Sequence, residues 1–202
     1  MTPSQLAEPR RSSVERVTSE TRVSVRLDLD GSGKADIKTG IPFYDHLLTA
    51  LVKHARLDAE IRCEGDLEID DHHSVEDVAL GLGQAIDQAL GDRRGIMRFG
   101  SAYAPLDEAL ARAVIDLSGR PWPEVTLDLK REQLGNLACE NVSHALRSLA
   151  IAARAALHVD VLRGENDHHR AEAAFKACAL ALRAALARDG SGEVPSTKGV
   201  LT

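Results

Sequence analysis

Hydrophobic and polar residues follow two different periods along the chain. Residues 21–30, TRVSVRLDLD, alternate with a period of two, which is typical of a β-strand with one buried face. GSGK at 31–34 predicts a turn, so residues 35–40 are expected to return as the hairpin partner of that strand. Residues 57–63 and 157–164 also alternate and predict two further strands. Hydrophobic residues recur at helical spacing in 74–90 and 170–186, and 43–54 and 140–157 are further candidate helices.

The chain also repeats itself after about 90 residues. Three pairs of matched features carry the repeat: Gly31 and Gly119 are 88 residues apart, His46 and His144 are 98 apart, and DDHHSVED at 70–77 returns 96 residues later as DHHRAE at 167–172. Repeats of this length indicate duplicated structural units. The sequence therefore predicts an α/β fold in two layers, with internally duplicated half-domains, each a small mixed sheet with two helices on one face.

Composition narrows the class of protein. With 202 residues, 44% hydrophobic and 28% charged, the chain is long enough for one folded body, and its net charge of −6 argues against a general binder of nucleic acid or of anionic membranes. No apolar run reaches membrane-spanning length, and the first 17 residues lack the apolar core of a signal peptide, so we expect a cytoplasmic protein. Cys63, Cys139 and Cys178 are widely spaced and are expected to be reduced and structural.

The repeated HHxxE motif points to metal chemistry. Successive helical residues point about 100° apart, so His72 and His73 are expected to serve two different sites, with Glu76 one turn beyond both. His168, His169 and Glu172 repeat this arrangement. Together with His46 and His144 they supply six imidazoles and two carboxylates, enough for two divalent ions such as Zn, Mn or Fe.

Other residues near the motifs have simpler explanations. A lone histidine is more often a hydrogen-bonded core or surface residue than a ligand, and we expect this of His54 and His158. Asp70, Asp71 and Asp167 precede the motifs, where an acid commonly caps a helix, and they could also orient the histidines.

Eight segments in order resemble the imidazoleglycerol-phosphate dehydratase family. They run from about residue 15 to residue 201: RVTSET…LDLDGSG…TGIPFYDHLL, DDHHSVED, GDRRGIMRFGSAYAPLDEAL, IDLSGRPW, NDHHRAEAAFKACALAL and PSTKG. The resemblance implies a hydro-lyase of histidine biosynthesis that converts D-erythro-imidazole glycerol phosphate to imidazole acetol phosphate, without a fused phosphatase domain. It also implies two Mn²⁺ per active site and a cytoplasmic homo-oligomer of 24 subunits with metal sites at subunit interfaces.

The resemblance implies roles for individual residues. One metal is expected on His72, His144, His168 and Glu172, and the other on His46, His73, Glu76 and His169. Glu20 is the first candidate for acid and base catalysis, Glu172 could share this work, and Glu108, the repeat counterpart of Glu20, is expected to be an ordinary solvated charge. The expected contacts of the substrate, mainly with its phosphate, are Glu20, Arg98, Arg120, Lys176, Ser196, Thr197 and Lys198. Lys176 also lies two turns after His169 on nearly the same helix face, so it should point toward the metals.

The implied reaction removes a poorly acidic proton and a hydroxide that leaves poorly. An imidazole ring held by metals at both nitrogens favours the deprotonated imidazolate, which can expel the hydroxyl group on the neighbouring carbon.

Within this resemblance the chain divides into a flexible arm at 1–14 and a dehydratase domain at 15–202, made of repeats at about 15–94 and 95–190 and a C-terminal phosphate-binding tail. Two other functions fit the histidines alone: a metal-storage or structural-metal assembly protein, and a dinuclear hydrolase of phosphate esters.

Overall fold

The computed structural model describes residues 9–201. Part of the expected N-terminal arm, residues 1–8, lies outside this range. Its last four residues, 11–14, are not an arm, because they begin strand β1 (Arg11–Val17) at the edge of the first sheet. No helix among the described residues is both long and apolar enough to cross a membrane.

The elements fall into two halves with the same order. The first half contains β1, β2 (Thr21–Asp28), β3 (Ala35–Lys38), α1 (Pro42–Ala55), β4 (Asp58–Gly65) and α2 (His72–Leu90). The second contains β5 (Phe99–Leu106), β6 (Ala109–Asp116), β7 (Trp122–Thr126), α3 (Cys139–Ala152), β10 (Ala156–Arg163) and α4 (Asp167–Leu186). A small hairpin, β8 (Gln133–Leu134) and β9 (Leu137–Ala138), is inserted before α3.

The two main sheets share one topology. Their strand orders are β1-β2-β4-β3 and β5-β6-β10-β7, and in each the last pair is parallel and the others are antiparallel. The predicted duplication and the mixed sheets are therefore confirmed. The predicted hairpin of residues 21–30 with 35–40 is wrong: β2 pairs with β1 and β4, and β3 joins β4 in parallel. Helix α1 provides the long crossover that a parallel pair requires, as α3 does between β7 and β10.

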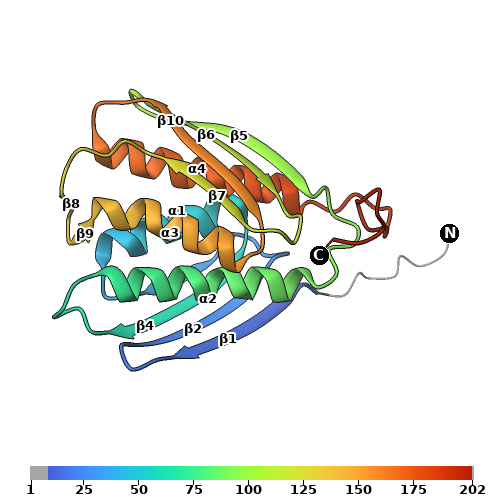
Figure 1. The fold of residues 1–202 in the computed structure, drawn as a ribbon, viewed down its shortest axis with the longest axis horizontal. Coiled ribbons are helices and arrows are strands. Elements are labelled where there is room, and N and C mark those ends of the chain that lie inside the picture. The colour runs from blue at the N-terminus through green and yellow to red at the C-terminus, as the bar shows by residue number, and fades with distance from the viewer. Residues whose placement is uncertain (1–8, 202) are drawn as a thin grey trace.

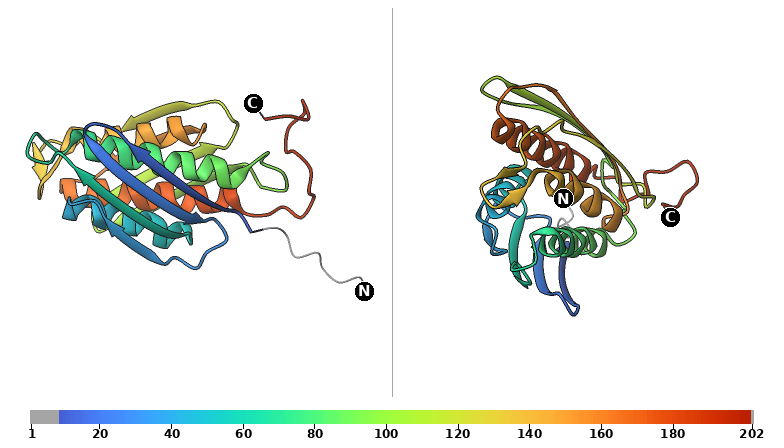
Figure 2. Two further views of the ribbon diagram at one scale, coloured as in Figure 1. Left: turned by 90° about the horizontal axis from the view of Figure 1, so that it is seen from below. Right: turned by 60° about the vertical axis from the view of Figure 1, so that its left-hand side comes forward.

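The helices lie between the two sheets (Figure 1). Helix α2 packs on β1 and β2, and α4 packs on β5 and β6, so each sheet buries one face as its alternating pattern predicts. The halves meet through their helices, because α1 packs on α4 and α2 packs on α3. Figure 2 shows the same order of layers from two further directions. All three cysteines are free thiols, as expected.

The two halves bring strand and helix together differently at one matched position. In the first half, the Ser12 hydroxyl on β1 donates to the backbone carbonyl of Ala85 on α2, at 2.7 Å. In the second half, the corresponding residue on β5 is Gly100, and a Cβ placed there would lie 1.9 Å from the carbonyl oxygen of Ala181 on α4. The second sheet therefore needs a residue without a side chain at this contact.

We expect Gly100→Ala to lower the free energy of unfolding by about 1–3 kcal/mol or more, because the added methyl group must separate β5 from α4. Denaturant unfolding monitored by circular dichroism measures the change. Ser13→Ala, at an exposed position of β1, is the control and should change the free energy by less than about 0.5 kcal/mol. Equal stability of Gly100→Ala and the parent chain would contradict the close strand–helix contact.

Candidate metal centre and active site

Both histidine pairs lie in the first turns of long helices that begin at the same end of the molecule (Figure 1). His72 and His73 open α2, and the N–H of His72 donates to the carboxylate of Asp70 at 2.8 Å, as expected of an acid before a helix. His168 and His169 lie in the first turn of α4. The cap there is Asn166, whose side-chain oxygen accepts from the N–H of His168 at 2.9 Å, and not the expected Asp167.

Each helix start forms a cluster of three side chains that could hold a metal ion, together with a helix from the other half. His72 and Glu76 on α2 meet His144 on α3, and His168 and Glu172 on α4 meet His46 on α1. Within each cluster, one ligand atom from each residue lies within 4.8 Å of the others. These two groups, here called triad A (His72, Glu76, His144) and triad B (His46, His168, Glu172), have the same chemistry: two imidazoles and one carboxylate.

The contacts inside the triads are short. In triad A, the Glu76 carboxylate lies 3.1 Å from Nε2 of His144, and the rings of His72 and His144 stack with centroids 4.8 Å apart. In triad B, one oxygen of Glu172 lies 3.0 Å from Nε2 of His46 and 3.2 Å from Nε2 of His168. A divalent cation fits this donor set, because imidazole nitrogens and carboxylate oxygens converge on one position.

The side-chain contacts within one chain differ from the partition that the sequence resemblance implied. That partition separated His46 from Glu172 and His144 from Glu76, whereas the structure places the members of each pair in contact. Sequence spacing could not reveal the true grouping, because it depends on which helix of one half packs on which helix of the other. The same prediction assigned the two histidines of each pair to different sites. In the structure, only one histidine of each pair belongs to a triad.

His73 and His169 belong to neither triad, and on their helices they project about 100° from His72 and His168; they are here called the outward histidines. Their rings are nearly perpendicular to those of His72 and His168, at 79° and 87°. Asp66 approaches Nδ1 of His73 at 3.0 Å, and Glu108 approaches Nδ1 of His169 at 2.7 Å. These hydrogen bonds raise the pKa of each imidazole, and they leave Nε2 of each ring directed away from its carboxylate partner.

Glu108 was expected from the sequence to be an ordinary solvated charge. The structure shows that it is not. Besides His169, its carboxylate accepts the backbone N–H groups of Asn166 and Glu165, at 2.8 and 3.1 Å. The N–H of Asn166, the His169 ring and the N–H of Glu165 together lower the pKa of Glu108 to about 2. Glu108 thus fixes the orientation of the second histidine of α4.

A second carboxylate stands near Nε2 of each outward histidine. Glu20, in the turn between β1 and β2, lies 3.7 Å from Nε2 of His73. Asp107, in the turn between β5 and β6, lies 3.7 Å from Nε2 of His169. In space, the counterpart of Glu20 is therefore Asp107, while Glu108 takes the part that Asp66 plays in the first half.

Asn141 connects Asp71, one of the acids that precede α2, to His72 of triad A. Its side-chain oxygen lies 3.1 Å from Nδ1 of His72, and its amide nitrogen donates to Asp71 at 2.9 Å. Asp71 therefore orients His72 through Asn141 instead of capping α2. Asn141 lies three residues before His144, one helical turn away, and this spacing is the sequence signal that could have identified it.

Lys176 points into the candidate metal centre, as its helical position predicts. Its Nζ lies 2.7 Å from the Glu172 carboxylate. Burial alone would raise the pKa of Glu172, but hydrogen bonds from His46 and Lys176 lower it to about 2. Glu172 is thus held as a carboxylate with several partners. His54 and His158 belong to neither triad, in agreement with the sequence analysis.

A family model described as imidazoleglycerol-phosphate dehydratase matches residues 39–182 of this chain. The match contains both triads together with His73 and His169. This chain belongs to the imidazoleglycerol-phosphate dehydratase family. A protein of that name from Salinibacter ruber is 56% identical over 194 residues, covering 96% of each chain. Another, from Phytophthora nicotianae, is 58% identical over 192 residues and covers 95% of this chain, which spans 42% of that longer protein.

Solved structures of the family have the same fold. The imidazoleglycerol-phosphate dehydratase of Staphylococcus aureus has a TM-score of 0.78 at 34% identity, covering 88% of this chain and 99% of that one. The enzyme of Pyrococcus furiosus, solved in complex with (S)-C348, has a TM-score of 0.80 at 36% identity, covering 93% and 100%. The duplicated α/β architecture is therefore that of the dehydratase family.

Arg98, Arg120 and residues 196–198, which are expected at the substrate phosphate, lie at the end of the molecule opposite the triads. The N–H of Arg98 donates to the carbonyl of Ala185, near the end of α4, whereas His168 lies in the first turn of the same helix. A helical rise of 1.5 Å per residue separates these two positions by about 25 Å. The Arg98 guanidinium pairs with Asp116 at 2.7 Å and donates to the carbonyl of Pro195 at 2.8 Å.

Arg120 and the C-terminal tail share this far end. Arg120 is exposed and follows Gly119, where a Cβ would lie 3.1 Å from the carbonyl oxygen of Leu201. Ser196, Thr197 and Lys198 belong to the same tail (Figure 1). Within one chain, the residues expected to bind the substrate phosphate, except Lys176, lie together at this end. They do not reach the triads of the same chain.

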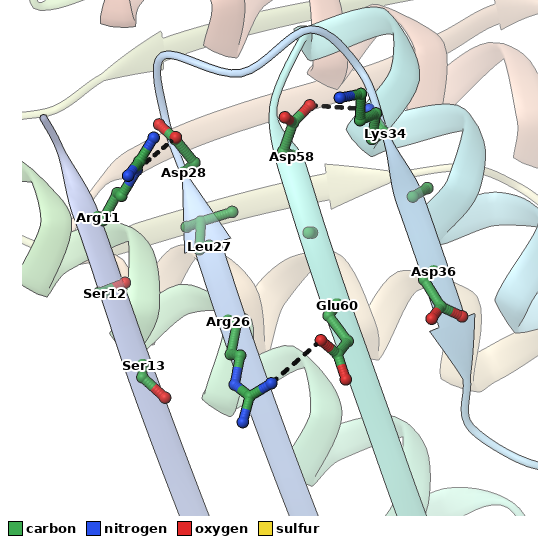
Figure 3. Close-up of a pocket in the computed structure, with 12 residues that line it drawn as sticks. Arg11, Ser12, Ser13, Arg26, Leu27, Asp28, Lys34, Asp36, Asp58 and Glu60 are labelled. Atoms are coloured by element: carbon green, nitrogen blue, oxygen red, sulfur yellow. Dashed lines mark hydrogen bonds and ion pairs between the residues drawn. The ribbon is translucent and has the colours of Figure 1, made fainter.

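A groove of about 630 Å³ on the outer face of the first sheet is not part of this site (Figure 3). Its charged residues bind each other: Arg11 pairs with Asp28 at 2.6 Å, and Arg26 pairs with Glu60 at 3.3 Å. Asp58 accepts backbone N–H groups of residues 32–34. No histidine lines the groove.

Proposed function

We propose that this chain is the hydro-lyase of histidine biosynthesis that converts D-erythro-imidazole glycerol phosphate to imidazole acetol phosphate. The observation that carries the proposal is the pair of matched triads, each accompanied by an outward histidine whose Nδ1 faces a carboxylate. A substrate with two ring nitrogens requires two such positions. Membership of the dehydratase family supports the same reaction.

Two Mn²⁺ per active site fit these residues. Triad A and triad B each supply two imidazoles and a carboxylate, and His73 and His169 belong to neither triad, with Nδ1 of each ring held by a carboxylate. We therefore assign the fourth protein ligand of each metal to His73 or His169 of a neighbouring copy. When bound, the metals would hold both nitrogens of the substrate ring and favour its imidazolate form.

Two carboxylates of the chain, Glu20 and Glu172, then have different roles. Glu20 is exposed and lies beside His73, so its carboxylate can take the proton from the carbon adjacent to the one that loses its hydroxyl group. Glu172 is already bound to His46, His168 and Lys176, and this commitment leaves it as a ligand rather than as the base.

The position of the phosphate residues argues for self-association. Only a three-carbon chain separates the substrate's ring from its phosphate, whereas about 25 Å of helix α4 separates His168 from Arg98 in one chain. Arg98, Arg120, Ser196, Thr197 and Lys198 must therefore come from a copy other than the one that supplies the triads. This arrangement fits the homo-oligomer of 24 subunits that the family resemblance implies.

Incubation of the manganese-loaded protein with imidazole glycerol phosphate tests the function. We expect a ketone product without release of inorganic phosphate. Phosphate release would instead support a hydrolase, and an inert protein with tightly bound metal would support a storage role. Either result would overturn the proposed reaction.

Glu20→Gln should keep both metals but lower kcat by about 10²–10⁴-fold, because it removes a proton acceptor without removing a ligand. Metal content by mass spectrometry and initial rates of ketone formation provide the measurement. Glu15→Gln, an exposed change on β1, is the matched control and should keep full activity. An unchanged kcat in Glu20→Gln would show that Glu20 is a surface charge without a part in the reaction.

Glu108→Ala should weaken manganese binding about 10–100-fold, because the His169 ring loses the carboxylate that orients it. Competition with a fluorescent chelator measures the affinity, and Glu15→Ala serves as the control. An unchanged affinity in Glu108→Ala would mean that His169 is oriented without Glu108 or does not bind metal.

Chelation should lower the particle mass, and added Mn²⁺ should restore both mass and activity, because a ligand that binds only the assembled state stabilises it. The double variant His73→Ala, His169→Ala should resist this restoration, since it removes the ligands that we assign to neighbouring copies. Light scattering decides the question. A mass that stays the same after complete metal removal would show that the metals do not hold the largest particle together.

A further inference from the structure

A buried carboxylate ties the turn that carries Glu20 to helix α2. Asp77 lies on α2 one residue after Glu76 and is only 4% exposed. One of its oxygens accepts the hydroxyl of Thr21, the residue after Glu20, and the other accepts the Nε–H of Arg16 on β1 at 2.7 Å. Asp77 therefore joins both strands that flank the Glu20 turn to the helix that carries the first HHxxE motif.

The backbone of Glu20 is held as well. Its N–H donates to the hydroxyl of Thr18 at 3.1 Å, and its carbonyl accepts the N–H of Asp66 at 3.2 Å. The same hydroxyl of Thr18 accepts the N–H of Thr21 at 3.0 Å. The main chain at Glu20 is thus fixed on both sides, while its exposed carboxylate lies 3.7 Å from Nε2 of His73.

The second half of the molecule forms the equivalent turn without this network. The register of β5 with β6 repeats that of β1 with β2 at the offset of 88 residues, and α4 repeats α2 at the offset of 96. The residues that match Arg16, Thr21 and Asp77 are all buried alanines: Ala104, Ala109 and Ala173. The strand–turn–strand unit therefore packs on its helix without any of these three polar side chains.

The two turns differ in the acids they carry. In the second half, the acid at the sequence position of Glu20 is Glu108, whose carboxylate is bound to His169 and to two backbone N–H groups. In the first half, the acid of the turn is the proposed proton acceptor. Burying a carboxylate is costly even when it is paired, so a buried Asp77 that the fold does not require indicates another role.

We propose that Asp77, through Thr21 and Arg16, is a positioning residue that holds the Glu20 carboxylate in place for proton removal. A general base must lie within hydrogen-bond distance of the proton that it takes, and a displacement of about 1 Å can lower the rate about 10²-fold. Because Asp77 is buried, it acts through the β1–β2 turn and not on the substrate. The inference rests on the role of Glu20 in the proposed function.

Two variants test the network: Asp77→Ala, and the triple variant Arg16→Ala, Thr21→Ala, Asp77→Ala. Both should lower kcat for ketone formation about 10²-fold, with KM and manganese affinity as in the parent chain. The triple variant leaves no partner unpaired and carries the residues of the second half, so its circular dichroism should be unchanged. Asp28→Ala is the matched control, because it removes a carboxylate paired with Arg11 at the far ends of the same two strands, and it should keep the parent's kcat.

A double variant shows whether Asp77 acts through Glu20. Added to Glu20→Gln, Asp77→Ala should lower kcat by no more than about threefold further, because the base that it positions is already absent. Independent effects would instead multiply, and that result would overturn the proposal. Thr21→Ser, which keeps the hydroxyl, should have a kcat nearer the parent's than Thr21→Val, which removes it, and equal values for these two variants would also contradict the proposal.

The remaining outcomes separate this inference from the proposed function. If the parent chain is active and Glu20→Gln is impaired, an unchanged kcat in Asp77→Ala overturns the positioning role alone. Weaker manganese binding in Asp77→Ala, or an unfolded triple variant, also overturns it, because Asp77 would then support the metal site or the fold. A parent chain that forms no ketone, or a fully active Glu20→Gln, would overturn the proposed role of Glu20 and this inference together.

Discussion

The packing of helices from opposite halves is the contact on which the candidate site depends. Neither half contains a complete triad: α2 needs His144 from α3, and α4 needs His46 from α1. The α2–α3 contact is unusually close, since a Cβ at Gly83 would lie 2.5 Å from the carbonyl oxygen of Leu149 and 2.7 Å from Cβ of Ala152. Glycine at this position allows the two helices to approach, and that approach fixes the distance across triad A.

The residues behind the ligands complete this arrangement. A histidine ligand needs one nitrogen fixed so that the other is available, and Asn141, Asp66 and Glu108 face the Nδ1 atoms of His72, His73 and His169. Because only one histidine of each pair belongs to a triad, one chain presents two triads and two separate outward imidazoles. The proposal that a complete site is shared between copies rests on this geometry.

Much of the fold and most of the candidate ligands could be predicted from the sequence. Alternation and the 96-residue repeat identified the duplicated halves, and the HHxxE spacing identified the divergence of His72 from His73. The pairing of β3 with β4 was missed because residues 11–17 were not recognised as the strand that takes the hairpin position beside β2. The grouping of the ligands and the role of Glu108 depend on contacts between segments far apart in the sequence, which local patterns do not encode.

A subunit-mixing experiment tests the shared metal sites most directly. One chain carries His73→Ala and His169→Ala, with both triads intact, and the other carries Glu76→Ala and Glu172→Ala, with both outward histidines intact. Each variant alone should be inactive toward imidazole glycerol phosphate after chelation and return of Mn²⁺. The mixture treated in the same way should regain activity, because the triads of one chain meet the histidines of the other. A mixture as inactive as its components would contradict metal sites shared between copies.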